Sequence, residues 1–374
     1  MMSRLHDPHD WLYRLRQFNI GLVLLIALFA TIGVLSLYSA GGGSMDRWAN
    51  AHLMRLVLGG FILLFCAFIP IKWWYRLSYP IYGLGLLLLL LVEIKGQIGM
   101  GAQRWISVGP IRLQPSELMK IAVIMALARY FHTIPAEYAK RLHILIIPVI
   151  LILMPVGLVL LQPDLGTALM ICMASAGVLF LAGVSVWLFI GGIIAAASMV
   201  PIAWQFLHDY QKQRVLTFLD PERDPLGAGY HITQSKIAIG SGGLSGRGFL
   251  EGTQSHLNFL PEKQTDFIFT LWVEETGLAG GLAILLLLAA IFGYGYYISF
   301  RNKLSYSRLL TLGLTINFSL YAFINIGMVM GLIPVVGAPL PLISYGGTSV
   351  LAVMIGFGLM ICTNIYRDSK LTRI

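Results

Sequence analysis

Long apolar runs separated by short polar connections limit most strongly how this chain can fold. A run of about 20 apolar residues spans the hydrocarbon of a bilayer as one helix. Ten such runs lie at 19–39, 52–71, 77–95, 114–132, 143–162, 165–185, 186–207, 266–298, 308–333 and 341–366. Charged residues make up only 11% of the chain, against about 25% in a soluble domain. The sequence therefore predicts one all-α polytopic membrane domain over 1–374, with ten transmembrane helices.

The placement of lysine and arginine predicts how these helices are oriented, because cytoplasmic loops carry an excess of both. With ten spans, the two termini lie on one side. That side receives Arg4, Arg14, Arg16, Lys72, Arg76, Lys140, Arg141, Arg301, Lys303, Arg308, Arg367, Lys370 and Arg373. The opposite short connections hold Arg47, Lys95, Arg104 and Arg112. We therefore expect a cytoplasmic N-terminus (1–18) and C-terminus (367–374), with a large extracytoplasmic loop at 208–265 between the seventh and eighth helices.

Composition argues against several other kinds of partner and site. The net charge of +9 lies largely on the cytoplasmic flank, which predicts contact with anionic membrane lipids and no nucleic acid. The three cysteines fall inside spans, and neither they nor the histidines have metal-ligand spacing. No metal site or cofactor is predicted, although a divalent cation could assist. The glycine stretch 240–248 lacks nucleotide-binding spacing, so it is either tight backbone near a substrate or a flexible loop.

The segment 208–265 is the one long polar stretch, and it ends beside Asp266 at the start of an apolar run. Its dense mixed charge cannot lie in hydrocarbon, so it lies at the membrane surface or in a wet cavity. Loops of this length are more often functional than idle. Asp266 has two interpretations, since aspartate commonly caps a helix N-terminus and an ionised carboxylate there can also accept a proton.

Ionisable residues inside apolar runs are candidates for function by default. Glu117 and Lys120 are three residues apart, so they share a helix face and can pair. The alternative is a structural ion pair that fixes helix packing. Arg104 and Arg112 lie on the connection before this helix. Because arginine grips phosphate with two donors, they suggest capture of a lipid diphosphate, and anchoring to lipid headgroups is the alternative.

Three further carboxylates lie at or within predicted spans. Asp164 opens the sixth span, where helix capping is the ordinary role. Glu274 and Glu275 lie two turns into the eighth span. Adjacent residues on a helix cannot point the same way, so at least one of these glutamates faces the bundle interior or a wet cavity. Pairing with a basic side chain is the structural interpretation.

Four motifs occur in order along nearly the whole chain. They are GAQRWISVGPIRLQPSELMK at 101–120, QPDLGT at 162–167, DPERDPLGAGYHITQSKIAIGSGGLSGRGFLEGTQSHLNFLPEKQTDFIF at 220–269, and NIGMVMGLIPVVGAPLPLISYGGTS at 325–349. Together they resemble the SEDS family of shape, elongation, division and sporulation proteins. The GTQS run before FLPE resembles the RodA branch more than the FtsW branch. Ala338 stands where a larger aliphatic residue is expected, a departure that affects packing.

The resemblance implies a peptidoglycan glycosyltransferase that polymerises lipid II during cell elongation, on the outer face of the bacterial cytoplasmic (inner) membrane. It implies that Asp266 is the catalytic residue, a general base on the 4-hydroxyl of the acceptor sugar. The candidate substrate-binding residues are Arg104, Arg112, Glu117, Lys120, Asp164, Arg214, Lys236, Gln254 and Ser344. The implied partners are the nascent glycan strand, a class B penicillin-binding protein (a transpeptidase) and the rod-elongation machinery.

Two rival functions belong to other classes. A transporter that flips lipid II would also need many spans and a charged cavity. It would, however, have no need of an outward loop that ends in one carboxylate, and the inverted repeats common in transporters are not detectable here. A purely structural subunit that positions a transpeptidase is the third possibility.

Overall fold

The computed structural model describes residues 11–99, 102–108, 111–135, 137–207, 209–220, 224, 227–257, 259–260 and 262–369. A helix occupies each of the predicted apolar runs. These helices are α2 (Ile20–Ala40), α3 (Asn50–Phe68), α4 (Ile71–Lys95), α5 (Pro115–Thr133), α6 (Ile146–Leu161), α7 (Leu165–Leu181), α8 (Val186–Phe206), α12 (Ile268–Arg301), α13 (Ser305–Val329) and α14 (Thr348–Ile365). Short helical turns η2 (Met45–Ala49), η3 (Tyr138–Lys140) and η4 (Leu142–Leu145) lie between them.

Seven helical stretches of the described residues are long and apolar enough to cross a membrane. In the described residues, the apolar stretches found in α7 and α8 are Leu165–Leu181 and Val186–Ile202, and α5 carries Glu117, Lys120 and Arg129. The chain is thus a helical, multi-pass membrane protein, whereas ten crossings stay a prediction.

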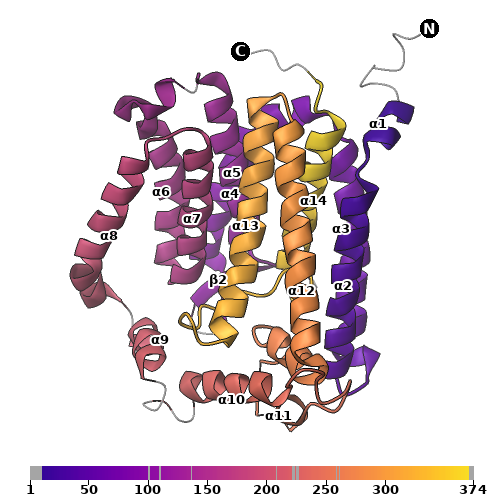
Figure 1. Cartoon of the computed structure of the whole chain (residues 1–374). Helices are drawn as coiled ribbons and strands as arrows, with labels where there is room; N and C mark the ends of the chain where they lie inside the picture. The colour runs from indigo at the N-terminus through magenta and orange to yellow at the C-terminus, as the bar shows by residue number, and fades with distance from the viewer. Residues whose placement is uncertain are drawn as a thin grey trace.

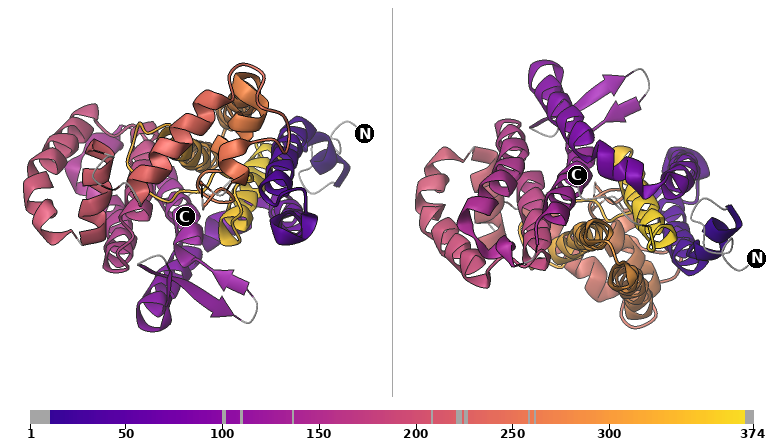
Figure 2. Two further views of the ribbon diagram at one scale, coloured as in Figure 1. Left: turned by 90° about the horizontal axis from the view of Figure 1, so that it is seen from below. Right: turned by 90° about the horizontal axis from the view of Figure 1, so that it is seen from above.

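The helices form an upright bundle with α13 at its centre, contacting α5, α7, α12 and α14 (Figures 1 and 2). Helix α8 stands at the edge, away from the centre of the bundle (Figure 1). Helix α1 (Trp11–Gln17) and the C-terminal end of α14 lie at one end of the bundle, where the Asn364 amide donates to the Gln17 carbonyl at 2.7 Å. Helices α10 (Ala228–Ser241) and α11 (Thr253–His256), which precede α12, lie at the other end of the bundle (Figure 1).

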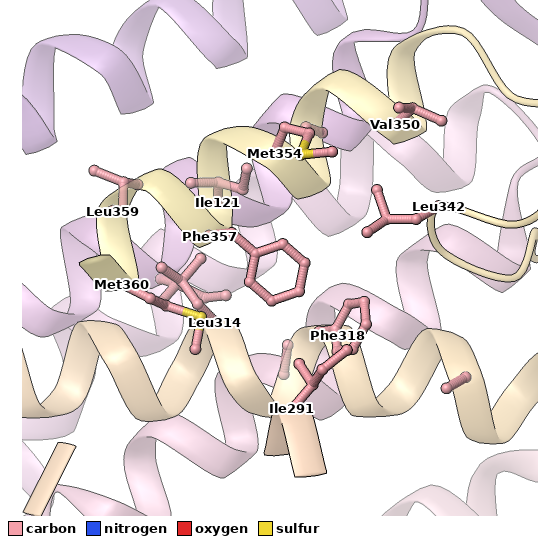
Figure 3. Packing of buried hydrophobic residues seen from close by; sticks show 14 of the residues in the cluster. Ile121, Ile291, Leu314, Phe318, Leu342, Val350, Met354, Phe357, Leu359 and Met360 are labelled. Atoms are coloured by element: carbon pink, nitrogen blue, oxygen red, sulfur yellow. The ribbon is translucent and has the colours of Figure 1, made fainter. Parts of the chain in front are cut away.

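The core lies where α5, α13 and α14 meet. Phe318 and Phe357 pack there edge to face, with ring centroids 4.9 Å apart (Figure 3). Gly313 lets the helices approach, since a Cβ at this position would lie 2.6 Å from the Ile124 side chain and 2.7 Å from that of Val178. Apolar tails of lipid offer no hydrophobic drive between helices, so close packing of this kind supplies the association.

The prediction of an entirely helical chain was wrong in the connection between α4 and α5. Strands β1 (Gln97–Gly99), β2 (Ala102–Val108) and β3 (Ile111–Leu113) form an antiparallel sheet in the order β1-β2-β3. The sheet projects from the side of the bundle (Figure 2). The backbone here lies outside the helices, so it pairs its amides and carbonyls through strands, which suit the aromatic and β-branched residues of the segment.

The segment 208–265 is more structured than a loop. It contains α9 (Asp209–Leu219), α10 (Ala228–Ser241) and the short α11 (Thr253–His256). Helix α10 packs against α12. Parts of both terminal segments, 1–10 and 370–374, lie outside the described residues, as do Arg4, Lys370 and Arg373.

The glycine stretch 240–248 is docked backbone to backbone on α12, which excludes the flexible-loop alternative. Helix α12 is interrupted at Gly277, with φ 69° and ψ −165°. The amides of residues 247 and 248 donate to the carbonyls of Glu274 and Glu275 at 3.0 and 3.1 Å, and the Leu278 amide donates to the Gly243 carbonyl at 2.9 Å. The stretch thus satisfies the polar groups that the broken helix leaves open, which an apolar setting demands.

Gly246→Ala should therefore destabilise the protein strongly. A Cβ at this position would overlap the Glu275 carbonyl and lie 2.6 Å from the Thr276 Cα, and the backbone has φ +83°. We expect a loss of about 2–4 kcal/mol from overpacking and left-handed strain. The matched control is Gly240→Ala in α10, where nothing lies within 4 Å of the added Cβ. The higher helix propensity of alanine should raise the free energy of unfolding there, by about 1 kcal/mol at most. Thermal unfolding in detergent measures both, and equal melting temperatures would contradict the tight docking.

Candidate active site

Asp266 lies in the turn 262–267 that leads into α12 (Ile268–Arg301). The capping interpretation is wrong, because the N-cap position is Phe267 and no side chain caps the helix there. In the described part of the chain, no group donates a hydrogen bond to the Asp266 carboxylate. Its Oδ2 atom faces Gly337, 3.6 Å from where a Cβ on that glycine would lie. As far as the described residues are concerned, both carboxylate oxygens are therefore available to a proton donor.

The turn 262–267 is fixed by α13 and by the segment between α13 and α14. The carbonyls of residues 264, 265 and 266 accept hydrogen bonds from the Tyr345 amide at 2.8 Å, the Ser344 hydroxyl at 2.7 Å and the Asn325 amide at 2.9 Å. The Ser344 hydroxyl also accepts from the Leu340 amide at 2.7 Å. Ser344, predicted to contact substrate, is buried and bonded to backbone on both sides.

The surroundings of Asp266 raise the pKa of its carboxyl to about 6. Removal from water is the main cause, since burial disfavours the charged form. The negative charge of Glu262 raises the pKa further, whereas the positive charges of Arg214 and Arg104 lower it. A carboxylate with this pKa is mostly ionised at neutral pH, and it is more basic than an ordinary aspartate. That is the balance a general base requires.

The structure brings Arg104 and Asp164 together near Asp266. Arg104 Nε on strand β2 lies 3.1 Å from Asp164 Oδ2. Asp164 also caps α7 as predicted, accepting from the Thr167 amide at 3.2 Å and from the Thr167 hydroxyl at 2.8 Å. The sheet thus positions Arg104, whose charge acts on the Asp266 carboxyl.

Arg214 and Lys236 reach the same region from α9 and α10. Arg214 Nη1 donates to the carbonyls of Val335 and Val336 at 3.2 and 3.4 Å. Lys236 is exposed, and its Nζ atom would lie 2.7 Å from a Cβ on Gly331. Both cations therefore lie against the loop that follows α13.

Glu117 and Lys120 form a buried ion pair, with Lys120 Nζ 2.8 Å from Glu117 Oε1. The Tyr321 hydroxyl completes it by accepting from Lys120 and donating to Glu117. Sequence reasoning missed Tyr321, although a phenol inside an apolar run was the available signal. A cavity of about 20 Å³ lies beside the pair. Its lining includes Glu117, Tyr321 and five of the core residues labelled in Figure 3: Ile121, Leu314, Phe318, Phe357 and Met360.

The remaining candidates have contacts that do not involve Asp266. Arg112 is exposed on β3, and its carbonyl accepts from the Thr348 hydroxyl at 3.0 Å. Gln254 uses its backbone amide to donate to Glu274 Oε1 at 2.7 Å. Glu274 also accepts from the amide and hydroxyl of Ser255 at 3.1 and 2.6 Å. It therefore binds the start of α11 rather than the basic side chain predicted.

Among the described residues, no group of three or more histidine, cysteine, aspartate or glutamate side chains could hold a metal ion. Glu275, the neighbour of Glu274, accepts from the Ser39 hydroxyl of α2. The charged side chains that act on the Asp266 carboxyl are Glu262, Arg214 and Arg104.

The model of a family of cell cycle proteins that includes FtsW, RodA and SpoVE matches residues 19–370. The chain belongs to this family. It is 45% identical over 352 residues to the peptidoglycan glycosyltransferase MrdB of Escherichia coli strain K12, covering 92% of this chain and 93% of that protein. It is 35% identical over 355 residues to the probable peptidoglycan glycosyltransferase FtsW of Idiomarina loihiensis, covering 94% of this chain and 86% of that protein.

Solved structures agree with this family membership. A chain from a peptidoglycan synthase complex that coordinates polymerization and crosslinking matches with a TM-score of 0.79 and 32% identity, covering 94% of this chain and 99% of that one. The rod shape determining protein RodA of Thermus thermophilus matches with a TM-score of 0.73 and 29% identity, covering 94% and 98%. The predicted likeness to the RodA branch is confirmed.

Proposed function

We infer that this chain is a peptidoglycan glycosyltransferase that polymerises lipid II into glycan strands during cell elongation. The names of its family relatives support the activity. The observation that supports general base catalysis in this chain is the environment of the Asp266 carboxylate. Its pKa is raised, and the positive charges of Arg104 and Arg214 act on it.

In the proposed reaction, Asp266 accepts the proton of the acceptor 4-hydroxyl. The acceptor oxygen forms a bond to the anomeric carbon of the donor sugar, and the bond from that carbon to the lipid diphosphate breaks. The diphosphate leaves with the electron pair, and cations stabilise the charge that develops on it. Arg104, Arg214 and Lys236 are the cations we assign to this role, with Arg112 at its rim. A single displacement inverts the anomeric configuration.

The setting follows from the same assignment. The basic residues Arg14, Arg301 and Arg367 lie on segments at the α1 end of the bundle, and we assign this end to the cytoplasm. Helices α9 to α11 and Asp266 then face outward from the bacterial cytoplasmic membrane. A penicillin-binding transpeptidase is the partner we propose, since the matching solved chain comes from a synthase complex. The nascent glycan strand and the rod-elongation machinery are the other partners that we propose.

The proposed base predicts how the rate depends on pH. The carboxyl of Asp266 has a pKa of about 6, raised chiefly by burial, and only its ionised form can accept a proton. The kcat/KM for polymerisation should therefore be level above this pH and fall about tenfold for each pH unit below it. A rate series at low lipid II concentration measures the break. A break near the ordinary aspartate value of 3.8 would contradict the environment described for Asp266.

Purified protein and lipid II test the function itself. Glycan strands in detergent indicate the transferase, whereas movement of lipid II across liposomes without strands would indicate the rival flippase. Neither product, with or without the transpeptidase, would indicate a structural subunit. We expect strands.

A further inference from the structure

We propose that Asn325 is a positioning residue for the polymerisation reaction, which fixes where the Asp266 carboxylate points. It does so by holding the backbone of Asp266 and the segment opposite it. The inference rests on the proposed function, in which Asp266 is the general base.

Asn325 lies near the C-terminal end of α13 (Ser305–Val329), and its side chain is fully buried. Its Nδ2 atom donates to the carbonyl of Asp266 at 2.9 Å and to the carbonyl of Ala338 at 2.8 Å. An amide nitrogen carries two hydrogens, and both are used. One side chain therefore ties the turn 262–267 to the segment that follows α13.

Both tied segments border the reacting carboxylate. Ala338 is next to Gly337, the glycine that faces Asp266 Oδ2. Asn325 thus sets the distance between the carboxylate and the opposite wall of the site. The amide is neutral, so it holds the turn without adding a charge that would change the basicity of the carboxylate.

The orientation of Asp266 needs such a backbone anchor. Within the described residues, no donor holds the carboxylate itself, so the position of its backbone limits the points that the carboxylate can reach. Proton transfer requires about 2.6–3.2 Å between heavy atoms, and a misplacement of about 1 Å can cost about 100-fold in rate. Ser344 and Tyr345 anchor the two preceding carbonyls, whereas Asn325 alone among these three holds Asp266.

Asn325→Ala tests the proposal, with Asn364→Ala as the matched control. Asn364 is also a buried asparagine, and its amide donates to a backbone carbonyl, that of Gln17, at 2.7 Å, at the opposite end of the bundle. Asn325→Ala loses two amide-to-carbonyl hydrogen bonds and Asn364→Ala loses one, so each variant should lose stability. Only Asn325→Ala should lower kcat per folded molecule, by about 10- to 100-fold with little change in KM.

The pH profile separates positioning from structural support. If Asn325→Ala relaxes the turn, Asp266 becomes better hydrated, and the acid break in kcat/KM should move below pH 6. In the control, the break should stay at the wild-type value of about 6. Equal kcat and an equal break in both variants, with only the melting temperature lowered, would overturn the proposal.

A second variant keeps the test decisive if Asn325→Ala does not fold. Ser344→Ala removes the hydroxyl that donates to the Thr265 carbonyl and accepts from the Leu340 amide, and it should lower kcat and shift the break in the same direction by a smaller amount. An unchanged kcat and break in Ser344→Ala would then overturn the proposal that the carbonyl anchors position the base. Wild-type protein that makes no glycan would instead contradict the proposed function, and active wild type with inactive Asp266→Asn upholds that function whatever Asn325 does.

Discussion

Asp266→Asn should abolish glycan polymerisation while the protein stays folded. The amide keeps the shape of the side chain but cannot accept a proton, and general base catalysis is typically worth about 10²–10⁴-fold. Stability should not fall. The pKa of the Asp266 carboxyl is raised from 3.8 to about 6, so ionising it disfavours the folded state as the pH rises through that range. At neutral pH, the uncharged asparagine should melt at the wild-type temperature or above.

The control for this variant is Asp368→Asn, the same chemical change at an exposed site that pairs with Lys303 at 2.7 Å. Asp368 lies in the segment that follows α14, after Ile365. Strand synthesis by purified proteins, with melting temperatures measured in parallel, compares the two. Polymer yield from Asp266→Asn close to that of the control would refute the assignment of the base.

Lys120→Met and Glu117→Gln should each destabilise the bundle strongly. Both side chains are buried and share the Tyr321 hydroxyl, so removing one leaves a charge without its partner. Breaking a buried pair in this way costs about 3–5 kcal/mol. The double variant contains neither charge and should recover most of the lost melting temperature. A double-mutant cycle in thermal unfolding measures this coupling, and purely additive losses would mean that the pair does not act as one unit.

Activity in the same cycle decides what Lys120 does besides packing. If the pair only fixes α5 against α13, polymerisation per folded molecule should recover in the double variant along with stability. If Lys120 also contacts the lipid diphosphate, the double variant should stay impaired. Tyr321→Phe is a useful companion, because it removes only the hydroxyl that bridges the two charges.

Local sequence determined the helices and part of the site. Each apolar run became a helix because a continuous apolar stretch in a membrane must bond its own backbone. Asp164 caps α7 as its position predicted, since capping needs only the neighbouring Thr167. The pairing of Glu117 with Lys120 followed from a spacing of three residues on one helix. Motifs in order along the chain were enough to predict the family.

Contacts between distant segments decided the rest, and no local pattern encodes them. Gly277 is one glycine in an apolar run, and nothing near it in sequence predicts that it interrupts α12. The interruption is possible because the backbone of 243–248 forms hydrogen bonds with the amides and carbonyls that the broken helix leaves unpaired. The pKa of the Asp266 carboxyl depends on burial and on charges brought from β2 and α9. Asn325 reaches Asp266 across 59 positions of sequence. Such contacts exist only once the helices have packed, so tertiary structure alone determined how the carboxylate is held.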